Sequence, residues 1–164
     1  IGLLALQLAL RSGAANVLVS EPISEKRKLA KKLGADVVVD PFNENLVDAA
    51  NKLTDGRGFN VCIEESGDPD VAKQLILLAA RCGTILWAAT YPMGFGVEVP
   101  IDYMFSRELS IRSVFLAPYS FTRAVQMLPK LDLKPLITVY PLKEAVKAFA
   151  DYKKGKGVKI LLQP

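Results

Sequence analysis

The 164-residue chain is 51% hydrophobic and 23% charged, values that suit one globular domain and exclude a disordered polypeptide. Its formal net charge is +4, and basic residues cluster between residues 26 and 32 and between 153 and 156, where we expect solvated helix faces and no nucleic-acid partner. Histidine is absent, which excludes Ser-His-Asp and Cys-His catalysis by these residues. We therefore expect no catalytic residue and no metal site within this sequence.

The first element predicted is an apolar helix over residues 3–10. The apolar run is about ten residues long and contains Gln7, which is too short and too polar for a membrane span. A turn with Gly13 and a strand over 16–19 lead to Glu21. The next elements predicted are a helix over 24–33, with Ser24 as N-cap and Gly34 as its stop, a strand over 36–40, a helix over 44–53, a strand over 59–63, a helix over 71–80 and a strand over 84–89.

Later in the chain, residues 91–107 are expected to form a loop, because prolines and glycines interrupt the pattern. After it we expect a strand over 109–115, a helix over 121–128, a strand over 136–139, a helix over 142–152 and a strand over 158–162. Alternation of strands with helices predicts parallel βαβ units and hence a doubly wound α/β sheet. Ligands of such sheets bind at the carboxyl ends of the strands. Those ends supply the candidates Glu21, Asp40, 64–67 and 88–90.

Gly2 and Glu21 have the spacing of a dinucleotide-binding motif. The last glycine of G-x-G-x-x-G opens a helix, and an acidic residue about 20 positions on binds the adenosine ribose. We predict that Gly2 lies beside the pyrophosphate, with close helix packing as the alternative. We predict that Glu21 binds ribose and repels a 2′-phosphate, which favours NAD, with a plain surface carboxylate as the alternative. The earlier glycines and the first strand would precede Ile1, so we expect a fragment truncated at that strand.

Two further features bear on the site and on the compartment. Ser66 and Gly67 stand at the end of a predicted strand. Gly67 lacks a side chain, which would allow close approach of a cofactor, and a simple turn is the alternative explanation. Cys62 and Cys82 stand in apolar stretches without a C-x-x-C pairing. We expect buried thiols of a cytoplasmic protein.

Several ordered motifs carry a resemblance to a family. They are Ile1-Gly2-Leu3-Leu4, Glu21 followed by Leu33-Gly34-Ala35-Asp36, Glu64-Glu65-Ser66-Gly67, Gly83-Thr84-Ile85-Leu86, Pro141-Leu142-Lys143-Glu144-Ala145 and Val158-Lys159-Ile160-Leu161-Leu162. Taken together the chain resembles the zinc-dependent medium-chain alcohol and polyol dehydrogenases. The resemblance implies a dinucleotide-binding domain over 1–116 and a C-terminal segment over 117–164 that completes a catalytic domain absent from this sequence.

That resemblance also implies a function. The parent protein would be an NAD-dependent oxidoreductase that transfers hydride between a secondary alcohol or polyol and NAD, with zinc held by the absent domain. These 164 residues alone would then be inactive. The apolar strand over 109–115 would pair with its copy, which implies a homodimer, with Tyr103, Met104 and Phe105 helping to cover the contact.

Further cofactor contacts follow from the resemblance alone. Ile1 would press on the nicotinamide side, while Lys26 and Lys159 match basic residues near the ribose and the pyrophosphate, a solvated lysine being the alternative for each. The backbone contacts would come from Ala88, Thr90, Val114 and Leu116. The sequence departs from the family at Ala89 and Ser113, where glycine is usual.

Two other functions fit parts of the pattern. An S-adenosylmethionine-dependent methyltransferase also uses a strand-helix glycine turn with an acidic residue after the second strand. Such folds usually end in an antiparallel hairpin, which the tail over 117–164 does not predict. A non-catalytic nucleotide-binding module is the third candidate, supported only by the absence of catalytic groups.

Overall fold

The computed structural model describes residues 1–116 and 119–164, and the chain divides into two compact units. The central unit consists of residues 1–2 and 43–120, and the split unit consists of residues 3–42 and 121–164. The predicted domain boundary between 116 and 117 adjoins residues 117 and 118, which lie outside the described residues. Among the described residues, every helix is too short or too polar to cross a membrane.

The split unit begins with a parallel βαβ arrangement. Its strands β1 (Leu18–Ser20) and β2 (Val37–Val39) pair in parallel, with Leu18 opposite Val37. Helices α1 (Gly2–Arg11) and α2 (Ser24–Lys32) supply apolar side chains to the same core. The buried residues of that core are Leu3, Leu6, Ala30, Ala35 and Leu136. As predicted, Gly34 follows α2 with a positive φ of 106°, which glycine adopts without a steric penalty.

The C-terminal part of the split unit packs onto that core. Helix α6 (Phe121–Met127) and the short 3₁₀ turns η1 (Leu128–Lys130) and η2 (Lys134–Leu136) precede a parallel pair, β6 (Ile137–Pro141) and β7 (Lys159–Gln163). The turn η3 (Leu142–Glu144) and helix α7 (Ala145–Lys153) connect the two strands. The buried amide of Gln7 donates to the carbonyl of Asp132 at 3.2 Å and accepts from its N–H at 2.7 Å. Gln7 thereby links α1 to the chain beyond η1.

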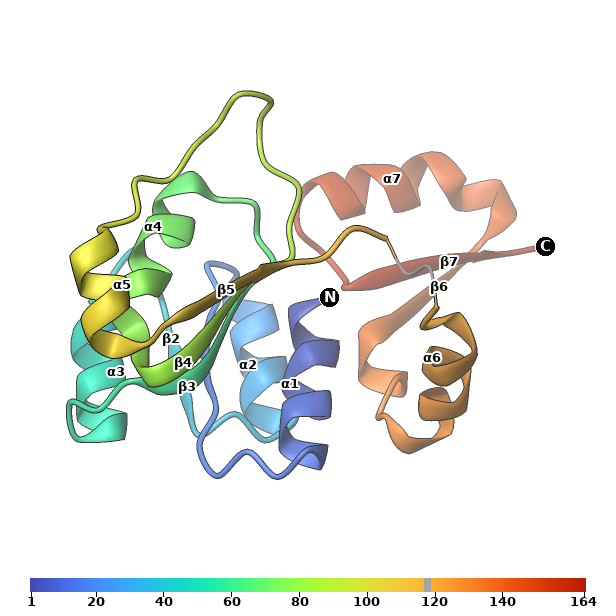
Figure 1. Ribbon diagram of the computed structural model, residues 1–164. Helices are drawn as coiled ribbons and strands as arrows, with labels where there is room; N and C mark the ends of the chain where they lie inside the picture. Colours follow the sequence, from blue (N-terminus) through green and yellow to red (C-terminus); the bar gives the residue numbers. More distant parts are fainter. Residues whose placement is uncertain (117–118) are drawn as a thin grey trace. The chain divides into compact units, whose positions relative to one another are not determined.

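The central unit is built on a parallel sheet of order β3-β4-β5 (Figure 1). The strands are β3 (Phe59–Glu64), β4 (Ala79–Trp87) and β5 (Ser110–Ser113), and the helices are α3 (Leu46–Thr54), α4 (Pro69–Leu78) and α5 (Ile101–Arg107). Ile85 in the middle strand β4 is fully buried. The carboxyl ends of β3 and β4 come together, because Glu64 lies opposite Trp87 in the register.

The predicted α/β fold with parallel strands is confirmed, and local chemistry explains where α3 and α4 begin. Asn45 caps α3, because its side chain accepts from the N–H groups of Val47 and Asp48. Asp68 caps α4 in the same way, and Pro69 occupies the first helical turn, where its missing N–H costs nothing. This Asp-Pro signal places the start of α4 before the predicted residue 71.

Four predictions were wrong. The expected loop over 91–107 contains α5, which begins after Pro100. Ser24 is not the N-cap of α2, since Ile23 holds that position without a side-chain bond. Cys82 is exposed, because it follows the buried start of β4 in a left-handed conformation with φ 58°. Arg27, expected on a solvated helix face, has a side chain only 21% exposed.

Candidate functional site

Glu21 immediately follows β1, where the motif spacing predicts ribose binding. Its N–H donates to the carbonyl of Val39 at 3.1 Å, which continues the β1-β2 ladder by one residue. Its Oε1 accepts from the N–H of Ile23 at 2.8 Å, which fixes the carboxylate against the turn before α2. Within the described part of the chain, Oε2 accepts no hydrogen bond. The carboxylate is therefore oriented and keeps one oxygen for a ligand.

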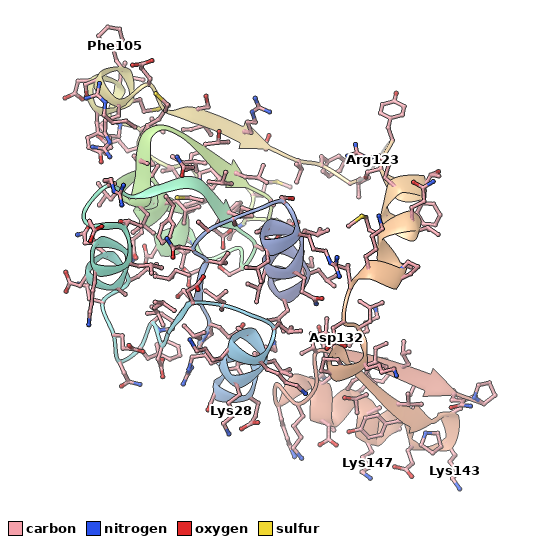
Figure 2. All side chains as sticks on the ribbon, turned by 90° about the horizontal axis from the view of Figure 1, so that it is seen from below. Lys28, Phe105, Arg123, Asp132, Lys143 and Lys147 are labelled. Carbon is pink, nitrogen blue, oxygen red and sulfur yellow. The ribbon has the colours of Figure 1, made fainter. Side chains whose placement is uncertain are left out.

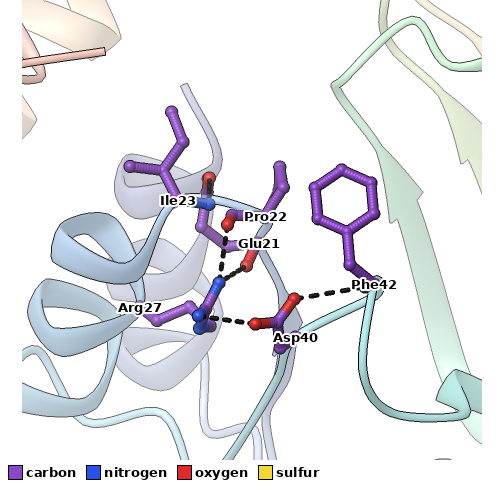
Figure 3. A network of polar contacts seen from close by, with 6 residues as sticks. All are labelled: Glu21, Pro22, Ile23, Arg27, Asp40 and Phe42. Carbon is purple, nitrogen blue, oxygen red and sulfur yellow. Dashed lines mark hydrogen bonds and ion pairs between the residues drawn. The ribbon is translucent and has the colours of Figure 1, made fainter. Parts of the chain in front are cut away.

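Arg27 anchors the turn that carries Glu21, a role that the sequence analysis missed (Figure 3). Its Nη1 donates to the main-chain carbonyls of Glu21 at 2.8 Å and Pro22 at 2.7 Å. Its Nη2 lies 2.7 Å from Oδ2 of Asp40, which follows β2 and is itself only 16% exposed. The other oxygen of Asp40 accepts from the N–H of Phe42 at 3.1 Å. The guanidinium thus holds together the ends of two neighbouring strands. The one feature of the sequence that could have indicated this role is the position of an arginine six residues after Glu21.

The two lysines that the resemblance adds remain predictions. Lys26 lies in α2 beside Arg27 and makes no ion pair within the described residues. Lys159 is the first residue of β7, is exposed, and lies opposite Ile137 in the β6-β7 register. The position of neither lysine distinguishes a residue that binds the cofactor from a solvated one.

Gly2 opens α1, and its surroundings bear on the packing alternative. A Cβ built on Gly2 would meet only Oε2 of Glu65, at an ordinary contact distance of 3.7 Å, among the described residues. Burial raises the pKa of the Glu65 carboxyl. Its Oε2 is buried and has no hydrogen-bond partner within the described residues. Ile1, the residue before Gly2, is 84% exposed.

Ser66 and Gly67 follow β3 in a turn held by Glu64. The carboxylate of Glu64 is 1% exposed and accepts from the N–H of Ser66 at 2.6 Å, from the hydroxyl of Ser66, and from the N–H of Gly67 at 3.1 Å. Gly67 has φ 77°, and a Cβ on it would lie 2.7 Å from the carbonyl oxygen of Thr90. The structure therefore explains the glycine by a close approach of two protein turns.

Ala88, Thr90 and Tyr91 follow β4 at the same edge of the sheet. The N–H of Ala88 donates to the carbonyl of Glu64 at 2.9 Å, which extends the β3-β4 ladder. The hydroxyl of Tyr91 donates to Oε2 of Glu64, and the ring of Tyr91 stacks on Phe95 with centroids 5.5 Å apart. Burial and the hydrogen bond to Glu64 raise the pKa of the Tyr91 phenol. Tyr91 was not predicted as a site residue.

Val114 and Leu116 follow β5, which ends at Ser113 opposite Trp87. Their side chains are 53% and 82% exposed, and Leu116 adopts a left-handed φ of 56°. Their backbone contacts to a cofactor stay predictions, as do those of Ala88 and Thr90.

Each unit thus contributes a separate set of polar groups. The split unit presents the oriented carboxylate of Glu21, and the central unit presents two turns held by Glu64 at strand ends. Taken by itself, the Glu21 carboxylate is an acceptor of the kind that ribose hydroxyls need, and the turns after β3 and β4 lie at strand ends, where ligands of such sheets bind. Among the described residues, no group of three or more His, Cys, Asp or Glu side chains is arranged to hold a metal ion.

Comparison with known proteins identifies the family of the chain. A family model described as zinc-binding dehydrogenase matches residues 1–130. L-threonine 3-dehydrogenase of Pyrococcus horikoshii is 36% identical over 146 residues, which cover 84% of this chain and 40% of that protein. Sorbitol dehydrogenase of Homo sapiens is 33% identical over 171 aligned residues, with 99% of this chain and 46% of that protein covered. The chain therefore spans less than half the length of these curated relatives.

Solved structures agree. A structure from Clostridium scindens described as a zinc-binding dehydrogenase superposes with a TM-score of 0.92 at 26% identity, covering 99% of this chain and 47% of that one. Another so described, from Sinorhizobium meliloti and bound to NADP, gives a TM-score of 0.89 at 30% identity, covering 100% of this chain and 49% of that one.

Proposed function

Because the chain belongs to the zinc-binding dehydrogenases, in the group of zinc-dependent medium-chain alcohol and polyol dehydrogenases, we propose that it forms the cofactor-binding part of an NAD-dependent oxidoreductase. The whole enzyme would transfer hydride between a secondary alcohol or polyol and the nicotinamide. The cofactor supplies the hydride chemistry when bound, and the residues of this chain bind and orient it. Family membership favours this function over the methyltransferase alternative.

The orientation of Glu21 is the observation that carries the proposal. A carboxylate with one oxygen fixed by Ile23 N–H and the other open is suited to accept from the hydroxyls of an adenosine ribose. The same negative charge opposes the 2′-phosphate of NADP. At about 4 Å, two unit charges interact by about 4 kcal/mol at an effective dielectric constant of about 20, which exceeds the roughly 1.4 kcal/mol of a tenfold preference. This supports NAD, although one structural relative binds NADP.

The nicotinamide half of the cofactor would be bound by the central unit. A doubly wound fold consists of two mononucleotide-binding halves, and Glu21 belongs to the first of them. The second half would use the strand ends after β3, β4 and β5. The residues proposed there are Ser66, Gly67, Ala88, Thr90, Val114 and Leu116, with Ile1 on the nicotinamide side. Gly2 and Lys159 would lie near the pyrophosphate, and Lys26 near the adenosine ribose that Glu21 binds.

Zinc and the alcohol substrate complete the proposal. We propose that the zinc ligands of the whole enzyme lie outside the described residues. Within the described residues, no group of three or more His, Cys, Asp or Glu side chains could hold a metal ion. L-Threonine and sorbitol are the first substrates to test, because relatives with those names match most of this chain.

Cofactor preference in the whole enzyme tests the proposal. We expect kcat/KM to be at least about tenfold higher with NAD than with NADP, and Glu21→Ala to reduce that ratio. Glu25→Ala is the matched control, because Glu25 is an exposed carboxylate on α2 that pairs with Lys28. It should leave the ratio unchanged. Equal kcat/KM values for the two cofactors in the unmodified enzyme would contradict the assignment of Glu21.

A further inference from the structure

The carboxylate of Glu64 is a buried hydrogen-bonding centre between two turns of the central unit. Its Oε1 accepts from the N–H and the hydroxyl of Ser66, and its Oε2 accepts from the N–H of Gly67 and the hydroxyl of Tyr91. All of these donors come from the turns after β3 and β4. A carboxylate that is 1% exposed is stabilised only if its oxygens are bonded in this way, so Glu64 and its donors hold one another in place.

The two turns are also in direct contact. A Cβ on Gly67 would lie 2.7 Å from the carbonyl oxygen of Thr90, so any spreading of the turns would alter the backbone at both residues. The main-chain bond from Ala88 to Glu64 joins the strands just before the turns, and the Tyr91 phenol joins them beyond it. Stacking on Phe95 fixes the plane of the Tyr91 ring. The Tyr91 phenol therefore supplies a side-chain hydrogen bond from the turn after β4 to the carboxylate that holds the turn after β3.

We propose that Glu64 and Tyr91 form a positioning pair that holds the Ser66–Gly67 turn and the Thr90 turn in the geometry that binds the nicotinamide half of the dinucleotide. This inference rests on the proposed function and extends it to two residues that touch the site only through others. A preorganised site binds its ligand more tightly, because its turns are already ordered and little conformational entropy is lost when the ligand binds. Loss of the pair should weaken the binding of NADH and leave the binding of the adenosine half unchanged.

Tyr91→Phe is the decisive variant, since it removes one hydroxyl and keeps the ring on Phe95. In the whole protein we expect the Kd for NADH to rise about tenfold, the loss expected for one hydrogen bond to a charged group. The Kd for 5′-AMP, a probe of the adenosine half alone, should stay within about twofold of the unmodified value. Glu64→Gln places an amide NH₂ among donors, so it should also raise the Kd for NADH while the Kd for 5′-AMP stays within about twofold.

Tyr140→Phe is the matched control, because the Tyr140 hydroxyl also donates to a carboxylate, that of Asp151, at 3.0 Å in the split unit. It should leave both Kd values unchanged. Unchanged NADH binding in Tyr91→Phe would overturn the positioning pair, and so would an equal rise for NADH and 5′-AMP, which indicates general destabilisation. If the unmodified protein binds neither NADH nor 5′-AMP, the proposed function itself fails. Should Glu64→Gln not fold, the comparison of Tyr91→Phe with Tyr140→Phe still decides.

Discussion

The guanidinium of Arg27 and the carboxylate of Asp40 lie 2.7 Å apart. Arg27 is the fourth residue of α2, and Asp40 immediately follows β2. The same guanidinium donates to the carbonyls of Glu21 and Pro22, so one side chain connects β1, β2 and the turn between β1 and α2. Both members of the ion pair are largely shielded from water, with 21% and 16% of their side chains exposed. Charge-assisted bonds in such surroundings are stronger than those on an open surface.

Replacement of Arg27 by Met should therefore destabilise the split unit. We expect the free energy of unfolding to fall by about 1.5–3 kcal/mol, because Asp40 loses its guanidinium partner and two carbonyls lose donors. Lys28→Met is the control, since Lys28 projects into solvent (Figure 2) and its pair with Glu25 is 70% and 76% exposed. Such exposed pairs contribute about 0–1 kcal/mol. Urea denaturation measures both, and equal effects would contradict a structural role for Arg27.

Gly67 should tolerate substitution less well than Gly56. Both have positive φ, 77° and 73°, but a Cβ on Gly56 meets nothing within 4 Å, whereas one on Gly67 meets the Thr90 carbonyl at 2.7 Å. Gly56→Ala should show only the backbone penalty of about 1 kcal/mol. Gly67→Ala should lose about 1–3 kcal/mol more, the usual range for overpacking. Equal midpoints in chemical denaturation would show that the turn at Thr90 yields without cost.

The two thiols should differ in reactivity. Burial raises the pKa of Cys62 from 9.0 to about 12, and a raised pKa means less thiolate, the reactive form, at any pH below that value. Cys82 is exposed. Alkylation by iodoacetamide at pH 8, followed by peptide mapping, should label Cys82 well before Cys62, and the difference should vanish in denaturant. Equal labelling of the native protein would contradict the buried position of Cys62.

The homodimer predicted through residues 109–115 gains a specific test. Strand β5 is at the edge of its sheet, and Phe115 and Phe105 near it are 85% and 84% exposed, with Phe105 projecting outward from α5 (Figure 2). Phe115→Glu should convert a dimer into a monomer at tens of micromolar, whereas Met93→Glu, at a residue that is even more exposed, should not. Light scattering of the whole protein measures this. A monomeric unmodified protein would remove the prediction.

Patterns along the chain predicted the parallel α/β fold, because strand and helix periodicities depend on residues close in sequence. The strand-end positions of Glu21, Ser66 and Thr90 followed from the same patterns. Residues whose function depends on a distant partner were missed. Arg27 was placed on a solvated face because its bond to Asp40 crosses 13 residues, and Tyr91 was passed over because its partner Glu64 belongs to another strand.

Short or unusual backbone also escaped prediction. Helix α5 has seven residues and follows a Pro- and Gly-containing stretch, so periodicity gave too little signal against the loop. Cys82 takes a left-handed conformation inside β4, and nothing in an apolar stretch marks where a strand will turn a side chain outward.

The bonds between Gln7 and Asp132 have a consequence for the order in which the chain folds during synthesis. They join positions 125 residues apart, and the whole of residues 43–120 emerges from the ribosome between them. At typical elongation rates that interval is roughly ten seconds. The central unit, nearly continuous in sequence, has time to form first. Leu3 and Leu6 of α1 meanwhile lack their partner Leu136, so the core of the split unit is completed only after residues 121–164 have been synthesised.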